Sequence, residues 1–207
     1  MNANLVRQLQ DSVLAAWFEG WVPGQAVSGN LMKKWFGKDE AFDNRLREDF
    51  GKPIQDILNT GNLISDFTKT PNGTLSLVLM LDQFSRNIYR DSPIPFILAD
   101  PQARIVARHA FENGYEDKLH PVHRAWLYMP LEHSEDKVDQ ALSVMKFQQL
   151  AEESNDTYKE LFESFSKYAQ DHKAVIDRFG RYPHRNKVVD RKSTPEEEEF
   201  MKDHNGW

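Results

Sequence analysis

Large apolar side chains recur every three or four residues along most of this 207-residue chain, which is the spacing of one face of an α-helix. Between residues 5 and 18 this spacing predicts a first helix, which Gly20 and Pro23 bring to an end. No segment of any length shows the alternation of apolar and polar residues that marks a β-strand. We therefore expect an all-α fold, an array of roughly eight to ten antiparallel helices in one domain over residues 1–207. A division into two halves, at about 1–114 and 115–207, is the alternative.

Cap and turn residues place the other expected helices. Asp39 begins a helix that Pro53 bends or restarts, and Thr74 begins a largely apolar helix that continues to about Arg90. Further starts are expected at Asp100 as a cap before Pro101, at Pro121, at Ser134, and at the capping-box sequences that begin with Thr157 and Thr194. Expected ends are Asn59 to Asn62, Asn113-Gly114, Pro130 and Gly180. Residues 20–37 are predicted to be a loop, and Pro71-Asn72-Gly73 a turn.

Composition excludes several classes of protein. The hydrophobic fraction of 40% and the aromatic fraction of 12% are enough for a packed core. A net charge of −6 disfavours a general nucleic-acid binder. Without cysteine the chain has no disulfide scaffold, no Cys-ligated zinc and no thiol catalysis. There is neither a signal-peptide pattern nor an apolar run of ~18 residues, so we expect a cytoplasmic protein with no membrane or nucleic-acid partner.

The first polar motif follows the most apolar stretch of the chain, residues 75–81. Its members are Asp82, Gln83, Arg86, Asn87 and Arg90. Asp82, Arg86 and Arg90 are four residues apart and share one helix face. One interpretation is an intrahelical salt bridge with a helix cap. The other is a functional site at the rim of the core, where charges need partners.

The second motif is Pro130-Leu131-Glu132-His133-Ser134-Glu135. Ser134 suits a helix cap and Glu135 suits a first helical turn. Those roles leave Glu132 and His133 unexplained. The motif is not His-Glu-x-x-His, so a metalloprotease is not supported.

The third motif is Arg178 to Asn186, which follows His172 on the same expected helix and contains Arg181, His184 and Arg185. Gly180 and Pro183 predict an ordered turn in place of a continued helix. So many arginines need anions, which are either the carboxylates of Asp82, Glu132 and Glu135 or a carboxylate or phosphate of a ligand. A nucleic-acid patch is disfavoured by the acidic chain. A metal held by His133, His172 and His184 is disfavoured by the neighbouring cations, so neither a metal nor a cofactor is predicted.

These motifs resemble the bacterial family called domain of unknown function 924. The matching segments are Trp17-Phe18, Leu81 to Arg90 with Ser85 in place of the usual Pro, Pro130 to Glu135, Arg178 to Asn186 with Tyr182 in place of Phe, and Arg191 to Glu197. Asp190 stands where the family usually has Gly. The resemblance implies a helical fold similar to tetratricopeptide repeats, and it implies no particular activity.

Three functional hypotheses follow. The first is a module that binds a small anionic ligand or a peptide, and its expected contact residues are Asp82, Gln83, Arg86, Asn87, Arg90, Glu132, His133, Glu135, Arg178, Arg181, His184, Arg185 and Asn186. The second is a hydrolase or transferase acting on an anionic substrate, with acid–base candidates Glu132, His133, His172 and His184. The third is a structural salt-bridge network within a protein-interaction scaffold. The sequence leaves open whether the protein is an enzyme, and it leaves the oligomeric state open.

Overall fold

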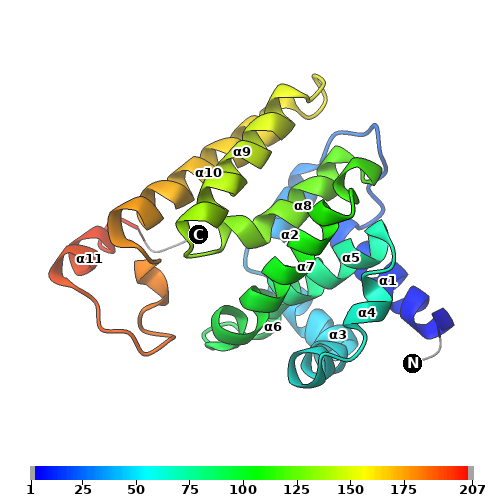
Figure 1. The fold of residues 1–207 in the computed structure, drawn as a ribbon, viewed down its shortest axis with the longest axis horizontal. Coiled ribbons are helices and arrows are strands. Elements are labelled where there is room, and N and C mark those ends of the chain that lie inside the picture. The colour runs from blue at the N-terminus through cyan, green and yellow to red at the C-terminus, as the bar shows by residue number, and fades with distance from the viewer. Residues whose placement is uncertain (1–2, 205–207) are drawn as a thin grey trace.

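The computed structural model describes residues 3–204, and no strand is present among them (Figure 1). The expected all-α fold is confirmed. The α-helices are α1 (Ala3–Phe18), α2 (Gly29–Phe36), α3 (Glu40–Thr60), α4 (Ile64–Phe67), α5 (Pro71–Val78), α6 (Ser85–Ile88), α7 (Asp100–Glu112), α8 (Pro121–Glu132), α9 (Lys137–Glu152), α10 (Lys159–Phe179) and α11 (Pro195–Phe200). Two π-helical segments, η1 (Leu79–Phe84) and η2 (Pro95–Ala99), and two 3-10 turns, η3 (Glu116–Lys118) and η4 (Pro183–Arg185), complete the order. The similarity to tetratricopeptide repeats stays a prediction.

The main core is aromatic and lies among α1, α3, α5, α8 and the α9–α10 pair. Trp17 and Trp126 meet edge to face, with ring centroids 4.9 Å apart, and both are almost fully buried. A second, smaller apolar cluster joins the end of α10 to Tyr182 and Phe200. In Figure 1 the α9–α10 pair extends away from the body of the molecule, and α11 lies at the far end of α10. The chain after α10 then turns back toward the α8–α9 junction, and this return positions the candidate site.

The helix α5 begins earlier than predicted. Pro71 is its first residue and Thr70 is its N-cap, because a proline at the first position of a helix loses no hydrogen bond. The prediction of a turn at Pro71-Asn72-Gly73 is therefore wrong. From Pro71 the chain stays helical through η1 to Ile88, as the apolar pattern indicates. Its middle is fully buried, which places Asp82 at the centre of the protein.

The predicted loop at residues 20–37 also contains a helix, α2. Ser28 caps α2 by accepting a hydrogen bond from the backbone N–H of Leu31. Trp35 is buried against Trp17, and its indole N–H donates to the backbone carbonyl of Trp17. The three glycines at positions 20, 24 and 29 conceal this short helix from pattern analysis.

Three expected caps have other roles. Asp100 does not cap α7, because η2 runs into α7 without a break and both Ala99 and Asp100 have right-handed helical geometry. The prediction that Ser134 caps α9 is wrong, because its hydroxyl donates to the side chain of Asp139. The cap of α9 is Asp136, whose Oδ1 accepts from the backbone N–H groups of residues 138 and 139. At the start of α10, Tyr158 occupies the cap position without a side-chain hydrogen bond, so the capping box at Thr157 is not formed.

Other boundaries agree with expectation. Gly180 ends α10 in the left-handed conformation with φ of 70°. Thr194 and Glu197 form the predicted reciprocal capping box of α11. The predicted end of α8 at Pro130 does not agree, because the helix passes through Pro130 and ends two residues later, at Glu132. Among the helices of residues 3–204, none is both long and apolar enough to cross a membrane.

Candidate functional site

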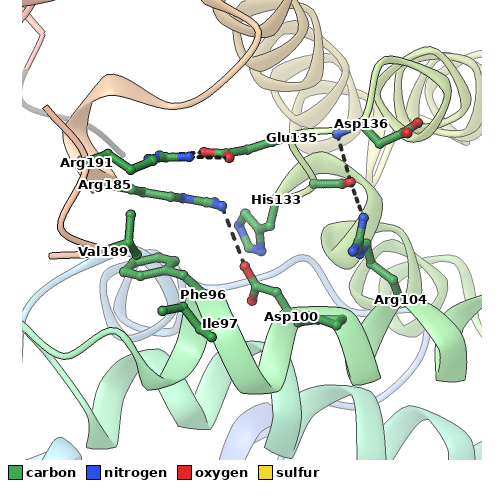
Figure 2. A pocket seen from close by; sticks show the side chains of 12 residues that line it. Phe96, Ile97, Asp100, Arg104, His133, Glu135, Asp136, Arg185, Val189 and Arg191 are labelled. Carbon is green, nitrogen blue, oxygen red and sulfur yellow. Dashed lines mark hydrogen bonds and ion pairs between the residues drawn. The ribbon is translucent and has the colours of Figure 1, made fainter. Parts of the chain in front are cut away.

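Parts of all three motifs meet around a cavity of about 230 Å³. One wall comes from η2 and the start of α7, the second from the turn between α8 and α9, and the third from the chain that follows α10 (Figure 2). The lining residues are Phe96, Ile97, Asp100, Pro101, Arg104, His133, Ser134, Glu135, Asp136, Arg185, Val189 and Arg191.

His133 and Asp82 form a hydrogen-bonded pair at the inner end of the cavity. Nδ1 of His133 lies 2.8 Å from Oδ1 of Asp82, which is completely buried. Burial alone would raise the pKa of Asp82, but its contacts with His133 and Arg86 lower it to about 2. Asp82 is therefore a carboxylate, and it also accepts a 2.5 Å hydrogen bond from the side-chain amide of Gln83.

The pair fixes the tautomer of His133. Burial and the positive charge of Arg86 lower the pKa of His133, against the attraction of Asp82, so the ring is neutral at neutral pH. Because a carboxylate only accepts, Nδ1 carries the ring proton and Nε2 is left as the acceptor. His133 thus offers a basic nitrogen on a side chain that lines the cavity.

Arg86 is fully engaged by the protein. Its Nη1 and Nη2 donate to the two carboxylate oxygens of Asp100 at 2.8 and 3.0 Å. Nη1 also donates to the backbone carbonyl of Asp82 at 2.7 Å. This two-pronged ion pair joins α6 to α7. Nη1 also lies 3.2 Å from Oδ1 of Asp82, which is an intrahelical salt bridge of the kind that the structural interpretation of the first motif predicts.

Arg185 is buried with few partners. It is 6% exposed, and its guanidinium lies 4.8 Å from the ring centre of Phe96 and 4.4 Å from that of Tyr182. Its one ion pair within residues 3–204 is a 3.6 Å approach to Oδ2 of Asp100, which Arg86 already occupies. Over the same residues its guanidinium makes no hydrogen bond, and Nε is buried without a partner. Burial lowers the pKa of Arg185, yet an arginine keeps its charge at physiological pH.

The outer wall is held by two other charged groups. Arg191 donates to both carboxylate oxygens of Glu135, at 2.6 and 2.9 Å, and Glu135 also accepts from the backbone N–H of Tyr182. On the opposite side, Arg104 donates to the hydroxyl of Ser134 at 2.8 Å and to Asp139. These contacts tie the α8–α9 turn to both neighbouring walls.

Glu132 and His172 lie behind the cavity. Glu132 is 5% exposed, one of its oxygens lies 3.5 Å from Nδ1 of His172, and the other has no partner within residues 3–204. Burial, together with the charge of Asp82, raises the pKa of Glu132 to about 8, so at neutral pH it is mostly protonated. Burial and the neighbouring His133 lower the pKa of His172 to about 3. Neither side chain lines the cavity.

The remaining residues expected at the site lie elsewhere. Asn87 and Arg90 both donate to Asp43 of α3. The side chains of the C-terminal turn bind α11 or its flanks: Arg178 pairs with Glu196, Arg181 pairs with Glu197, and Asn186 donates to Ser193 and Glu197. His184 lines a different cavity of about 500 Å³ between the end of α10 and α11. Ligand binding by these residues stays a prediction, and none of them lines the cavity that contains Arg185.

Several lining residues were not anticipated. Asp100 carried the signal of a helix cap, and Arg104 sits on α7, which none of the motifs includes. Phe96 and Ile97 belong to η2, a segment that carries no polar motif. Arg191 had a usable signal, since it continues the basic run after Asn186. No three His, Asp or Glu side chains within residues 3–204 gather in a way that could hold a metal ion.

Comparison with known proteins places the chain in a family. The family model described as "Bacterial protein of unknown function (DUF924)" matches residues 13–205. The chain belongs to the DUF924 family. Every residue lining the cavity falls within the DUF924 match.

One solved structure extends the comparison from sequence to fold. The protein of unknown function ATU0120 from Agrobacterium tumefaciens is 28% identical, with a TM-score of 0.80 over 96% of this chain and 99% of that one. The resemblance to DUF924 inferred from the motifs is thereby confirmed, and so is the helical fold. No curated protein matches the chain.

Proposed function

We propose that the cavity between η2, the α8–α9 turn and the C-terminal return binds a small anionic molecule through Arg185. The observation that supports this proposal is the unused hydrogen-bonding capacity of a buried guanidinium. Arg185 has five N–H donors, and its one ion pair with the described residues is a 3.6 Å approach to a carboxylate that Arg86 already holds. A buried charge that is poorly paired costs several kcal/mol, and an anion with two hydrogen bonds to Arg185 would offset that cost.

The other arginines around the cavity support the proposal by contrast. Arg86 and Arg191 each make a two-pronged pair with a carboxylate, and Arg104 binds a hydroxyl and a carboxylate. A purely structural network would leave Arg185 equally well satisfied. The cavity volume of about 230 Å³ lies below the ~300–1,000 Å³ typical of drug-sized ligands, which favours a small molecule.

The test compares Arg185→Met with Arg178→Met. Both variants remove an arginine from the same sequence motif, but Arg178 is exposed and pairs with Glu196 outside the cavity. We expect small carboxylates or inorganic phosphate to raise the melting temperature of the wild type and of Arg178→Met, but not that of Arg185→Met. Equal responses from all three proteins, or no response from any, would contradict the proposal.

A second candidate is an enzyme that uses His133 as a general base on the bound anion. The observation that favours it is the Asp82–His133 pair, which holds a neutral ring with its basic Nε2 on a side chain lining the same cavity as Arg185. We expect His133→Asn to abolish turnover of carboxylate-bearing nitrophenyl esters or amides while the variant still binds the anion. Turnover that is absent from the wild type, or unchanged in His133→Asn, counts against this candidate.

A further inference from the structure

The charges of the cavity wall nearly cancel. Among the described residues, three arginines line it, Arg104, Arg185 and Arg191, and so do three acidic residues, Asp100, Glu135 and Asp136. The carboxylate of Asp136 is turned toward the backbone N–H groups at the start of α9. In Figure 2 the guanidinium of Arg185 lies between the Glu135–Arg191 pair and Asp100. A ligand bound at Arg185 therefore has a carboxylate on either side of it. One negative charge on the ligand is matched by Arg185, whereas a second would approach these carboxylates.

The other cations are not available to a second negative charge. Arg86 is held by Asp100, Arg191 by Glu135, and Arg104 by Asp139 and Ser134. Recruiting one of them would break an ion pair and leave a partly buried carboxylate uncompensated, which is costly. Within residues 3–204, the cavity thus offers one uncommitted positive charge, that of Arg185.

The rest of the wall near Arg185 is apolar. Phe96, Ile97 and Val189 lie on the side of Arg185 opposite to Glu135 (Figure 2). Ile97 is 55% exposed, so this apolar wall continues to the protein surface. A hydrocarbon group on the ligand would cover these side chains, and the burial of its CH₂ groups would favour binding.

From the charge count and the apolar wall we infer that the ligand is a short monocarboxylate with an apolar substituent, and that dicarboxylates and phosphate are discriminated against. The inference rests on the proposed anion binding at Arg185 and narrows it to one chemical class. Glu135 and Asp100 act as the selectivity elements, because they repel a second charge while their own arginine partners stay occupied.

The experiment is a titration with butyrate, succinate and inorganic phosphate at constant ionic strength, followed by protein NMR. We expect butyrate to bind the wild type at least tenfold more tightly than succinate or phosphate, and Arg185→Met to lose butyrate binding. Glu135→Gln replaces the carboxylate by a neutral amide and releases Arg191. We therefore expect the preference for butyrate over succinate to fall by about tenfold, which corresponds to ~1.4 kcal/mol. Glu196→Gln is the matched control, since Glu196 pairs with the exposed Arg178, and its selectivity should equal that of the wild type.

The outcomes separate the two proposals. If succinate or phosphate binds more tightly than butyrate and Arg185→Met abolishes that binding, the monocarboxylate inference is overturned and anion binding at Arg185 stands. An unchanged preference in a folded Glu135→Gln overturns the role of Glu135 in selectivity. If none of the three probes binds the wild type, the proposed function fails, and the inference fails with it.

Discussion

At the scale of single residues, Arg185 differs from the other arginines of the site in how well its charge is paired. Arg86 and Arg191 stabilise the fold because each is matched by a carboxylate in two-pronged geometry. Arg185 is buried to the same degree as a core residue, and among residues 3–204 it obtains one long ion pair in return. Its stacking between Phe96 and Tyr182 recovers part of the loss through cation–π attraction.

This contrast predicts the effect of Arg185→Met on stability. A methionine fills similar space between the two rings without a buried charge, so we expect the free energy of unfolding to stay within about 1 kcal/mol of the wild type or to rise. Arg86→Met should instead lower it by roughly 3–5 kcal/mol, because Asp100 and Asp82 lose their main cation. Urea denaturation of both variants in an anion-poor buffer measures the difference. A loss of several kcal/mol in Arg185→Met would indicate a structural arginine.

Glu132 predicts a dependence of stability on pH. Its ordinary pKa of 4.5 is raised in the fold to about 8 by burial and by the charge of Asp82, so the folded state retains a proton that the unfolded state has released. This contribution is present below pH 4.5 and is lost as the pH rises toward 8. Glu132→Gln keeps a neutral side chain at every pH.

We therefore expect Glu132→Gln to become progressively more stable relative to the wild type as the pH rises from 5 to 8. The gain in the free energy of unfolding should be about 1.4 kcal/mol per pH unit between the unfolded and folded pKa values. Comparing the two proteins at each pH cancels the titration of the buried histidines, including His172 beside Glu132. A constant difference between them across this range would show that Glu132 is ionised in the fold.

At the scale of secondary structure, the segment Pro71 to Ile88 determines how the site is built. Its apolar first half fixes it in the core, and the π-helical turns of η1 carry Asp82, which binds the cavity-lining His133. Such turns are often found at functional sites, because the extra residue per turn redirects side chains. The entry to this segment depends on Gly73, where a Cβ would overlap the backbone carbonyl oxygen of Phe67.

Gly73→Ala should accordingly destabilise the protein by roughly 1–3 kcal/mol, as expected for overpacking against backbone. Gly29→Ala is the matched control, since Gly29 is also in the first turn of a helix and nothing lies within 4 Å of an added Cβ. We expect Gly29→Ala to be neutral or slightly stabilising, and thermal unfolding of the two variants provides the comparison. Equal stabilities would mean that α4 and α5 can move apart at little cost in free energy.

The same scale shows how far sequence reasoning extends. The long helices follow from apolar spacing, and their ends at Gly61 and Gly180 follow from the left-handed conformation that glycine adopts readily. The helix at residues 29–36 and the ion-pair role of Asp100 cannot be predicted from the sequence, because a glycine-rich segment resembles a loop and an Asp before Pro resembles a helix cap. Both features depend on tertiary contacts: Trp35 packs against Trp17, and Asp100 binds Arg86.

At the scale of the whole molecule, the cavity is made by three parts of the chain that are distant in sequence. Motif analysis brings together His133, Glu135 and Arg185, since each belongs to one of the three polar motifs. It cannot separate Arg185 from Arg178 or Arg181, because that distinction depends on where α11 folds back. Glu197 of α11 holds Arg181 and Asn186, so the terminal helix secures the turn that carries Arg185.

This arrangement predicts that α11 supports the cavity from a distance. Arg181→Met removes the two-pronged pair with Glu197, and we expect faster hydrogen exchange at residues 183–200 and several-fold weaker anion binding, with little change in the main core. Arg178→Met is the control, because its pair with Glu196 is exposed and contributes little. Exchange at residues 183–193 that is unchanged in Arg181→Met would show that the turn is held by its other contacts alone.

The central claim is that the buried guanidinium of Arg185 receives an anion from outside the protein. The most direct measurement is a ¹H–¹⁵N spectrum of the arginine side chains during titration with butyrate, with the Nε–H of Arg185 assigned from Arg185→Lys. We expect this resonance to shift saturably as Nε gains an acceptor, while the resonance of Arg178 stays in place. An Arg185 resonance that does not move at saturating butyrate, inorganic phosphate or succinate would contradict the claim.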